Sequence, residues 1–296
     1  CLRFPDSPCH IPIRRHRLHL RPLRRISKQM KEKVITLYAM KYPDFGPTLA
    51  TEKLFEMDGI RISDETLRKW LLEQGIWKKK RKRSIYRQWR PRRACFGEMV
   101  QMDGSHHDWL EGRGPKLVLM GYIDDATNKI YAKFYDYEGT LPAMDSFKGY
   151  AMTYGLPLSV YLDRYTTYKS SKKPTEWDEV DGQEFLSQFE RALKELGVEV
   201  IHALSPQAKG RVERLFGVLQ DRLVKEMRLQ GIKTKNAANR FLETYLPKYN
   251  QKFSVCPANE LDAHIQLPNH LDLDKYLCTL LSKLPQIGEI TLENIA

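Results

Sequence analysis

The sequence predicts an α/β fold, a mixed five-stranded sheet with helices on both faces, preceded by a smaller all-α region. Two observations lead to this prediction. After residue 97, short apolar runs typical of strands alternate with helical patterns, in the order three strands, helix, strand, helix, strand, helix. Before residue 78, three short helical patterns follow one another with turn signals between them. A chain of 296 residues is long enough for two or three such domains.

The all-α region, residues 27–77, is predicted from capping residues and helical spacing. It begins at Ser27, a residue type that caps helix N-termini. We expect a first helix that stops before Pro43, a second over 47–57 and a third from Ser63 onwards. Three short helices with a glycine-containing turn between them form a helix-turn-helix unit.

This unit would bind DNA through its third helix, because the second helix of a helix-turn-helix pair enters the major groove. Arg68 and Lys69 of that helix would then face the DNA. A small helical bundle with no DNA role is the alternative. The dense basic run that follows the unit makes DNA binding the better interpretation.

The basic run, residues 78–94, is expected to be a linker. So many like charges repel one another and cannot form a core, so the run should become ordered along DNA phosphates. Its expected DNA contacts are Lys78, Lys79, Lys80, Arg81, Lys82 and Arg83. Tyr86 and Trp89 fit equally well with stacking on exposed bases and with anchoring the linker on the next domain.

The net charge of +12 belongs entirely to the N-terminal third of the chain. Residues 1–100 hold 25 of the 49 Lys and Arg residues but only 10 of the 37 Asp and Glu residues. Phosphate neutralisation supplies most non-specific affinity for nucleic acid, so double-stranded DNA is the expected partner. A basic tail kept for solubility is the alternative. Residues 1–26 show no apolar period, and we expect them to be disordered or the remnant of a domain.

The core, residues 95–254, should begin with an antiparallel meander of strands over 98–102, 116–123 and 129–135. The elements expected after it are a helix over 141–154, a strand over 158–162, a helix over 183–196, a strand over 198–203 and a helix from Ser205. This order is that of a ribonuclease-H-like fold, and a mixed sheet covered by helices satisfies the layer rules of protein architecture.

Three acidic residues of this core are candidate metal ligands. Asp103 follows the first strand and precedes Gly104, which we expect to end that strand; Asp163 follows the strand over 158–162. Glu213 lies on the last helix, at the edge of an apolar stripe with helical spacing. Carboxylates from separate elements can hold two divalent metal ions, which activate water and stabilise the leaving oxygen in phosphodiester cleavage. Taken alone, without other carboxylates beside it, Glu213 is better interpreted as an ordinary solvated helix glutamate.

Three motifs around these acids resemble those of bacterial insertion-sequence transposases of the DDE retroviral-integrase superfamily. They are QMDGS around Asp103, VYLDR around Asp163 and SPQAKGRVER around Glu213, and the last is the most specific. The resemblance covers residues 97–254. It implies a ribonuclease-H-like catalytic core in which the three acids are both the catalytic residues and the ligands of two Mg²⁺ ions, with Mn²⁺ as a substitute. It also implies assembly as a homo-oligomer on paired DNA ends.

Asp181 competes with Asp163 for the second position of the motif. It lies 32 residues before Glu213, nearer the spacing of many integrases, and DGQEF resembles their DNGxEF pattern. The stretch before Asp181 is acidic and polar, however, whereas an apolar strand leads into Asp163 and would hold its carboxylate rigidly. We therefore choose Asp163 and interpret residues 164–182 as an insertion.

Residues near the acids have weaker functional signals. Lys209 and Arg211 stand at the start of the last helix, after a loop, and we expect both to contact DNA phosphates. His106 and His107 fit a pair of surface histidines better than residues that position water or DNA. The acidic pair at residues 124 and 125 is expected to consist of solvent-exposed turn residues.

The end of the chain, residues 255–296, shows no basic strand-rich module of the kind that such transposases usually add, so we expect a short or truncated tail. The chain begins at Cys1 rather than at a methionine, which suggests a fragment or a disrupted copy.

Five cysteines without paired spacing indicate a reducing compartment. No apolar run reaches the length of about 18 residues that a membrane span requires. We therefore expect a cytoplasmic, nucleoid-associated protein with no membrane partner.

These observations predict a DNA transposase or integrase-like recombinase. It would cut a phosphodiester at each element end and join the freed 3′-hydroxyl to target DNA, without a covalent protein intermediate. Two alternatives are a catalytically silent, DNA-binding remnant that represses transposition and a ribonuclease-H-like nuclease that cuts without strand transfer. Salt-sensitive DNA binding does not separate the recombinase from the silent remnant, whereas metal-dependent cutting does.

Overall fold

The computed structural model describes residues 26–78, 91–162, 187–202, 210–268 and 272–277. The chain divides into two compact units, with the boundary between Ser84 and Ile85, and each unit is described by itself. Within the described ranges, no helix is both long enough and apolar enough to cross a membrane.

The described part of the N-terminal unit consists of three helices. They are α1 (Lys28–Lys41), α2 (Pro47–Asp58) and α3 (Asp64–Glu73). The hydroxyls of Ser27 and Ser63 cap α1 and α3, accepting hydrogen bonds from the N–H groups of Met30 at 3.2 Å and Thr66 at 3.1 Å. Helix α2 ends at Asp58 and is capped by Gly59, which adopts the left-handed conformation with φ of 67°. The three helices lie where the sequence predicts them.

The C-terminal unit is built on a five-stranded sheet with the strand order β4-β3-β2-β5-β6. Its strands are β2 (Val100–His107), β3 (Leu117–Asp124), β4 (Ile130–Tyr135), β5 (Ser159–Leu162) and β6 (Glu199–His202). Strands β2, β3 and β4 form an antiparallel meander, and β5 and β6 join it in parallel beside β2. This mixed sheet confirms the predicted α/β, ribonuclease-H-like fold class.

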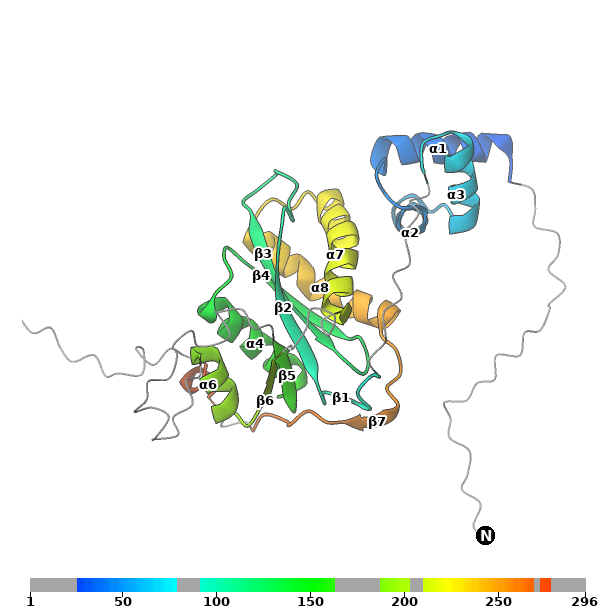
Figure 1. Ribbon diagram of the computed structural model, residues 1–296. Coiled ribbons are helices and arrows are strands. Elements are labelled where there is room, and N and C mark those ends of the chain that lie inside the picture. Colours follow the sequence, from blue (N-terminus) through cyan, green and yellow to red (C-terminus); the bar gives the residue numbers. More distant parts are fainter. Residues whose placement is uncertain (1–25, 79–90, 163–186, 203–209, 269–271, 278–296) are drawn as a thin grey trace, which may run out of the picture. The chain divides into compact units, whose positions relative to one another are not determined.

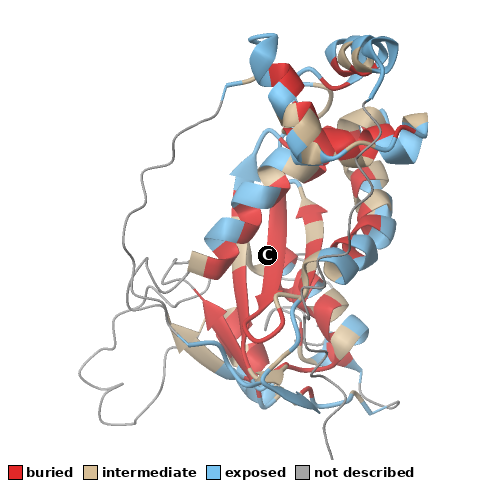
Figure 2. Ribbon diagram, turned by 90° about the vertical axis from the view of Figure 1, so that its right-hand side faces the viewer, coloured by how far each residue is buried: buried red, intermediate tan, exposed pale blue. Residues whose placement is uncertain are grey.

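Helices cover both faces of this sheet, as Figure 1 shows. They are α4 (Thr140–Tyr154), α6 (Gln188–Glu195), α7 (Gly210–Leu229) and α8 (Lys235–Phe253). Helices α4 and α6 pack on the face that carries Val100 and Met102, whereas α7 and α8 pack on the face that carries Leu119 and Phe134. Side chains alternate along a strand, so burial of both faces produces two separate apolar cores. Figure 2 shows the strands largely buried between exposed outer helix surfaces.

Strand β2 is longer than the sequence predicts. The sequence places its end at Gly104, but the strand continues to His107, with Gly104 opposite Met120. A Cβ atom on Gly104 would lie 2.6 Å from Cδ of Glu138, so the glycine leaves room for this carboxylate rather than stopping the strand. Asp103 therefore lies inside a strand and not at its end.

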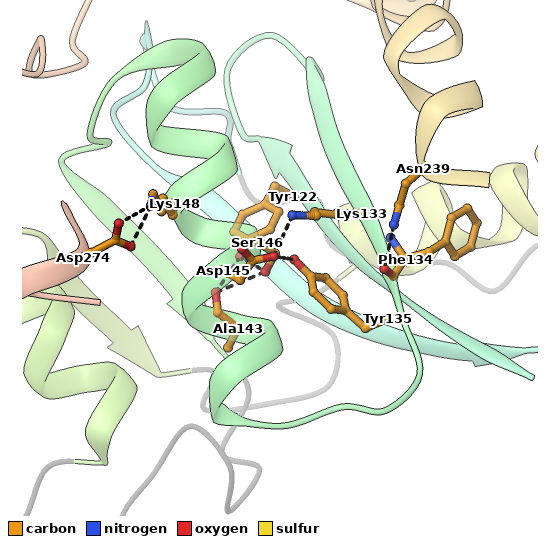
Figure 3. Close-up of polar contacts among 10 residues, drawn as sticks. All are labelled: Tyr122, Lys133, Phe134, Tyr135, Ala143, Asp145, Ser146, Lys148, Asn239 and Asp274. Atoms are coloured by element: carbon orange, nitrogen blue, oxygen red, sulfur yellow. Dashed lines mark hydrogen bonds and ion pairs between the residues drawn. The ribbon is translucent and has the colours of Figure 1, made fainter. Parts of the chain in front are cut away.

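One edge of the sheet, strand β4, is covered by two asparagines of α8. Asn239 accepts a hydrogen bond from the N–H of Phe134 at 2.7 Å and donates to its carbonyl oxygen at 3.0 Å (Figure 3). Asn250 makes the same pair of bonds with Ile130, at 2.8 and 2.9 Å. Open edge strands offer N–H and C=O groups on which other chains can pair. The two asparagines close this edge at two of its residues, Phe134 and Ile130.

Helix α4 is joined to β4 and to the C-terminal segment by charged side chains (Figure 3). The Asp145 carboxylate accepts hydrogen bonds from Lys133 Nζ at 2.6 Å and from the Tyr135 hydroxyl at 2.5 Å. Burial raises the pKa of Tyr135, and the bond to Asp145 raises it further. On the same helix, Lys148 forms an ion pair with Asp274 at 2.6 Å.

Part of the C-terminal segment packs on the core, which the sequence does not predict. Strand β7 (Asn259–Asp262) pairs in parallel with β1 (Cys95–Phe96). The His264 side chain, 0% exposed, contacts Asp262 Oδ1 through Nδ1 at 2.6 Å and the Tyr150 hydroxyl through Nε2 at 2.7 Å. This part of the expected tail therefore belongs to the folded core.

The contribution of Asn250 to closing the β4 edge can be tested by replacing it with alanine. The change removes both bonds to the Ile130 peptide groups and leaves them partly buried, so we expect a loss of about 1–3 kcal/mol in the free energy of unfolding. Urea denaturation followed by circular dichroism measures this loss. Asn236, an exposed residue of the same helix, is the matched control, and Asn236→Ala should change the stability by less than about 0.5 kcal/mol. Equal effects of the two changes would contradict a role for Asn250 at the edge.

Candidate active site

Asp103 lies on the face of β2 that α7 covers. Because side chains alternate along a strand, Asp103 shares this face with Gln101 and Ser105, and both of these bond to α7. The Gln101 side-chain oxygen accepts a hydrogen bond from the N–H of Val212 at 3.3 Å, and Ser105 Oγ accepts one from Gln220 Nε2 at 3.2 Å. Asp103 is half-buried between these two bonded positions.

Helix α7 forms because its apolar residues recur at helical spacing. The predicted stripe is confirmed, since its members Val212, Leu215, Phe216, Leu219 and Leu223 are all buried. Glu213 lies in the first turn, beside this stripe, and is exposed. An acidic residue in the first turn of a helix interacts favourably with the helix dipole.

A close approach between α7 and β3 places Glu213 near the strand of Asp103. Gly121 is opposite Asp103 in the β2–β3 register, and a Cβ atom on Gly121 would lie 2.8 Å from Cε1 of Phe216. Phe216 follows Glu213 by three residues, and Val212, which bonds to β2, precedes it by one. Along the helix, one contact with the sheet therefore precedes Glu213 and another follows it.

Arg211, expected to contact DNA phosphates, instead points into the protein. Its side chain is 9% exposed, and its Nε donates to Asp125 Oδ1 at 2.7 Å. The interpretation of Asp124 and Asp125 as solvent-exposed turn residues is wrong, because both are buried. Asp124 accepts hydrogen bonds from the N–H groups of Gly97 and Thr127, and burial raises the pKa of its carboxyl group. Helical spacing alone could not show that the turn after β3 covers Arg211.

Glu138 is a carboxylate beside β2 that the sequence does not single out. Its side chain is 12% exposed, and its Oε2 lies 2.8 Å from Nε2 of His106. It occupies the space that Gly104 leaves open, on the face of β2 opposite to Asp103. His106 and His107 are both exposed. No sequence pattern around Glu138 indicates that it lies beside β2, because its position depends on the path of the loop that leads into α4.

Several predicted site residues lie outside the described ranges. They are Asp163, Lys79, Lys80, Arg81, Lys82, Arg83 and Lys209, together with the competing Asp181. Strand β5, which precedes Asp163 in the chain, ends at Leu162 and pairs with β2 through Tyr161 and Gln101. Among the residues that are described, no group of three His, Cys, Asp or Glu side chains could hold a metal ion. The structure thus describes two of the three predicted acids.

The N-terminal unit carries three of the predicted DNA contacts within the described residues. Arg68 Nη2 lies 3.1 Å from Asp64 Oδ2, and Arg68 Nη1 also bonds to Glu65 on the same helix. Lys69 and Lys78 are exposed. Ion pairs at the surface contribute little to stability. The DNA-binding role of the three residues stays a prediction.

Comparison with known proteins gives two relatives in sequence, although no family model matches the chain. The "Putative transposase y4bF" of Sinorhizobium fredii is 40% identical over 252 residues, which cover 84% of this chain and 54% of that protein. The chain is similar to bacterial transposases. The transposase for insertion sequence IS1202 of Streptococcus pneumoniae is 29% identical over 306 aligned residues, which cover 90% of this chain and 64% of that transposase.

These relatives confirm the resemblance to insertion-sequence transposases that the three motifs indicate. The chain spans 54% and 64% of the length of the two transposases. Among solved structures, the magnesium complex of the HTLV-2 integrase catalytic core matches 51% of this chain and 88% of its own, with 19% identity and a TM-score of 0.38. A chain of the simian T-cell lymphotropic virus intasome matches 71% of this chain and 67% of its own, with 17% identity and a TM-score of 0.43.

The contact at Gly121 provides a test of how α7 docks on the sheet. A methyl group at this position would overlap the Phe216 ring, so Gly121→Ala should cost about 1–3 kcal/mol in the free energy of unfolding, measured by urea denaturation. Gly217 is the matched control on α7, because nothing lies within 4 Å of a Cβ atom built there. We expect Gly217→Ala to stabilise the protein by about 0.5–1 kcal/mol through helix propensity. A loss at both positions, or at neither, would contradict the close approach of α7.

Proposed function

We propose that this chain acts as a DDE-type DNA transposase, an integrase-like recombinase. It would cut a phosphodiester at each element end and transfer the freed 3′-hydroxyl to target DNA. The observation that supports this most directly is the docking of the first turn of α7, with Glu213, against the strand that carries Asp103. The similarity to two transposases supports the same class of reaction.

Asp103, Asp163 and Glu213 are the catalytic acids of this proposal. In the chain, Asp163 directly follows β5, which is parallel to β2 and pairs with it at Val160 and Val100. A residue that follows such a strand is better anchored than one that follows a polar stretch, as Asp181 does in the sequence. The choice of Asp163 over Asp181 rests on this argument.

The donor set suits two Mg²⁺ ions, because hard divalent cations prefer carboxylate oxygens. Asp103, Asp163 and Glu213 would hold the ions, and Mn²⁺ could substitute. When bound, such ions activate the attacking oxygen and stabilise the leaving oxygen of a phosphodiester. The contribution of the chain is rigidity, since Gln101 and Ser105 tie β2 to α7 on both sides of Asp103.

Double-stranded DNA, both element ends and target, is the proposed partner. The proposed contacts are Arg68, Lys69, Lys78, Lys79, Lys80, Arg81, Lys82, Arg83 and Lys209. Arg211 is left out because its guanidinium is buried against Asp125. Assembly as a homo-oligomer on paired DNA ends and a location at the nucleoid in the cytoplasm belong to the same proposal.

Nicking of supercoiled plasmid and of short duplexes in Mg²⁺ or Mn²⁺ tests the catalytic assignment. We expect Asp103→Asn, Asp163→Asn and Glu213→Gln each to reduce cutting by at least about 100-fold, since each removes a charged metal ligand. Asp181→Asn is the matched control, because it is the same change at the competing acid, and it should keep the activity of the parent.

The products separate the proposal from its alternatives. Cutting followed by joining to target DNA agrees with a transposase, whereas cutting without joining indicates a nuclease. A parent that binds DNA but never cuts, in either metal and on either substrate, would show a silent remnant and refute the catalytic proposal. Loss of cutting in Asp181→Asn but not in Asp163→Asn would refute the choice of second acid.

The salt dependence of DNA binding tests the role of the basic run. Replacing its first six residues, 78–83, by serine removes six positive charges, and the slope of log K against log salt should become shallower by about 0.9 for each charge that neutralises a phosphate. Fluorescence anisotropy with a labelled duplex at several salt concentrations measures this slope. Serine at three exposed lysines of the C-terminal unit, Lys116, Lys233 and Lys248, is the control and should leave the slope near that of the parent. An equal change in both variants would contradict a specific role for the run.

A further inference from the structure

A buried carboxylate, Asp125, joins three parts of the core next to the candidate acids. Its side chain is 0% exposed. Its Oδ1 accepts hydrogen bonds from Arg211 Nε at 2.7 Å and from Gln101 Nε2 at 3.3 Å, and its Oδ2 accepts one from the backbone N–H of Arg93 at 2.8 Å. One side chain thus connects the start of α7, strand β2 and the end of the basic run.

The side chains of Arg211 and Gln101, which bond to Asp125, lead to the first turn of α7. Arg211 lies in that turn, two residues before Glu213. Gln101 extends the connection, because its amide nitrogen donates to Asp125 while its amide oxygen accepts the N–H of Val212. The first N–H groups of a helix have no acceptor within the helix, so this external bond determines where the turn rests.

The turn that contains Asp125 also holds the end of the basic run. Arg92 Nη1 donates to the carbonyl oxygens of Asp125 at 3.2 Å and Ala126 at 3.3 Å, and to Asn128 Oδ1 at 2.8 Å. Burial and the nearby guanidinium of Arg211 lower the pKa of Arg92. Two guanidinium groups therefore lie close to one buried carboxylate, and removal of that charge would leave both insufficiently compensated.

We propose that Asp125 is a positioning residue for Glu213, which it holds in place through Arg211 and Gln101 together with the docked backbone of Arg93. The proposal rests on the catalytic function proposed for Glu213. The backbone N–H of Arg93 and the first turn of α7 bond to the same carboxylate, so Asp125 also joins Arg93 to the start of this helix.

The test is Asp125→Asn in the full chain, which keeps the size of the side chain and removes its charge. Changes to groups that orient metal ligands lower metal affinity or activity by about 10–100-fold, so the Mg²⁺ concentration for half-maximal nicking should rise about tenfold. Hydrogen–deuterium exchange mass spectrometry, without metal or DNA, should show faster exchange of the peptide that covers residues 211–216. The second readout does not depend on catalysis.

Asp124→Asn is the matched control. Asp124 is the neighbouring residue and is 1% exposed. Its carboxylate accepts hydrogen bonds from the N–H groups of Gly97 and Thr127, which do not belong to α7. We expect this variant to melt at a lower temperature while its Mg²⁺ midpoint and its exchange over 211–216 stay at parental values. Arg211→Lys, which keeps the charge but not the Nε donor, should show a smaller shift in both readouts and serves if Asp125→Asn does not fold.

The outcomes separate this proposal from the proposed function. Unchanged exchange over residues 211–216 in Asp125→Asn would overturn the positioning role, whether or not the parent cuts DNA. Faster exchange with an unchanged Mg²⁺ midpoint in a cutting parent would overturn the connection to Glu213. A parent that never cuts would refute the catalytic function itself, and the exchange measurement would still decide whether Asp125 holds the first turn of α7.

Discussion

The packing of α7 against β2 and β3 is the contact on which the candidate site depends. Glu213 is exposed at the surface of α7. Its position follows from buried neighbours on either side, the Val212 N–H bonded to Gln101 and the Phe216 ring packed over Gly121. A hydrogen bond such as that of Val212 contributes only about 1 kcal/mol, but a close-packed interior does not permit small shifts of a helix. These buried contacts fix the backbone position of the exposed Glu213.

The polar groups beneath the start of α7 contribute more to the placement of this helix on the sheet than to the stability of the folded protein. A buried ion pair such as that of Asp125 with Arg211 loses the hydration of both charges, and well-packed apolar groups would often be at least as stable. Its bonds are directional, however, and each partner becomes costly to bury when the other is removed. The pair therefore disfavours other placements of α7 on the sheet. Conflicts with simple burial rules of this kind are expected near functional sites.

The C-terminal unit is also closed by segments from far along the chain. Helix α8 covers the β4 edge through Asn239 and Asn250, while β7 and His264 pack beside β1 and α4. Both sets of contacts supply hydrogen-bond partners to backbone or ring polar groups that would otherwise be open to solvent or to another chain. The described part of the segment after residue 255 thus belongs to the core, although its sequence has little strand character.

The sequence by itself determined the elements of this protein and the acids worth testing. Capping serines such as Ser27, the apolar stripe of α7 and the alternation within the sheet are local patterns, because a helix or strand buries a face that its own spacing defines. The motifs around Asp103 and Glu213 are equally local, and they point to the transposase resemblance that the relatives confirm.

Only the tertiary structure decided which polar residues are buried. Arg211 and Asp125 are 86 positions apart, and neither has a neighbour in sequence that reveals the other. In the sequence, Gly104 is typical of a strand end. The structure shows that it instead leaves room for the side chain of Glu138, 34 positions later. A polar side chain is buried when a distant segment covers it and supplies its hydrogen bonds, and that depends on chain topology rather than on local spacing.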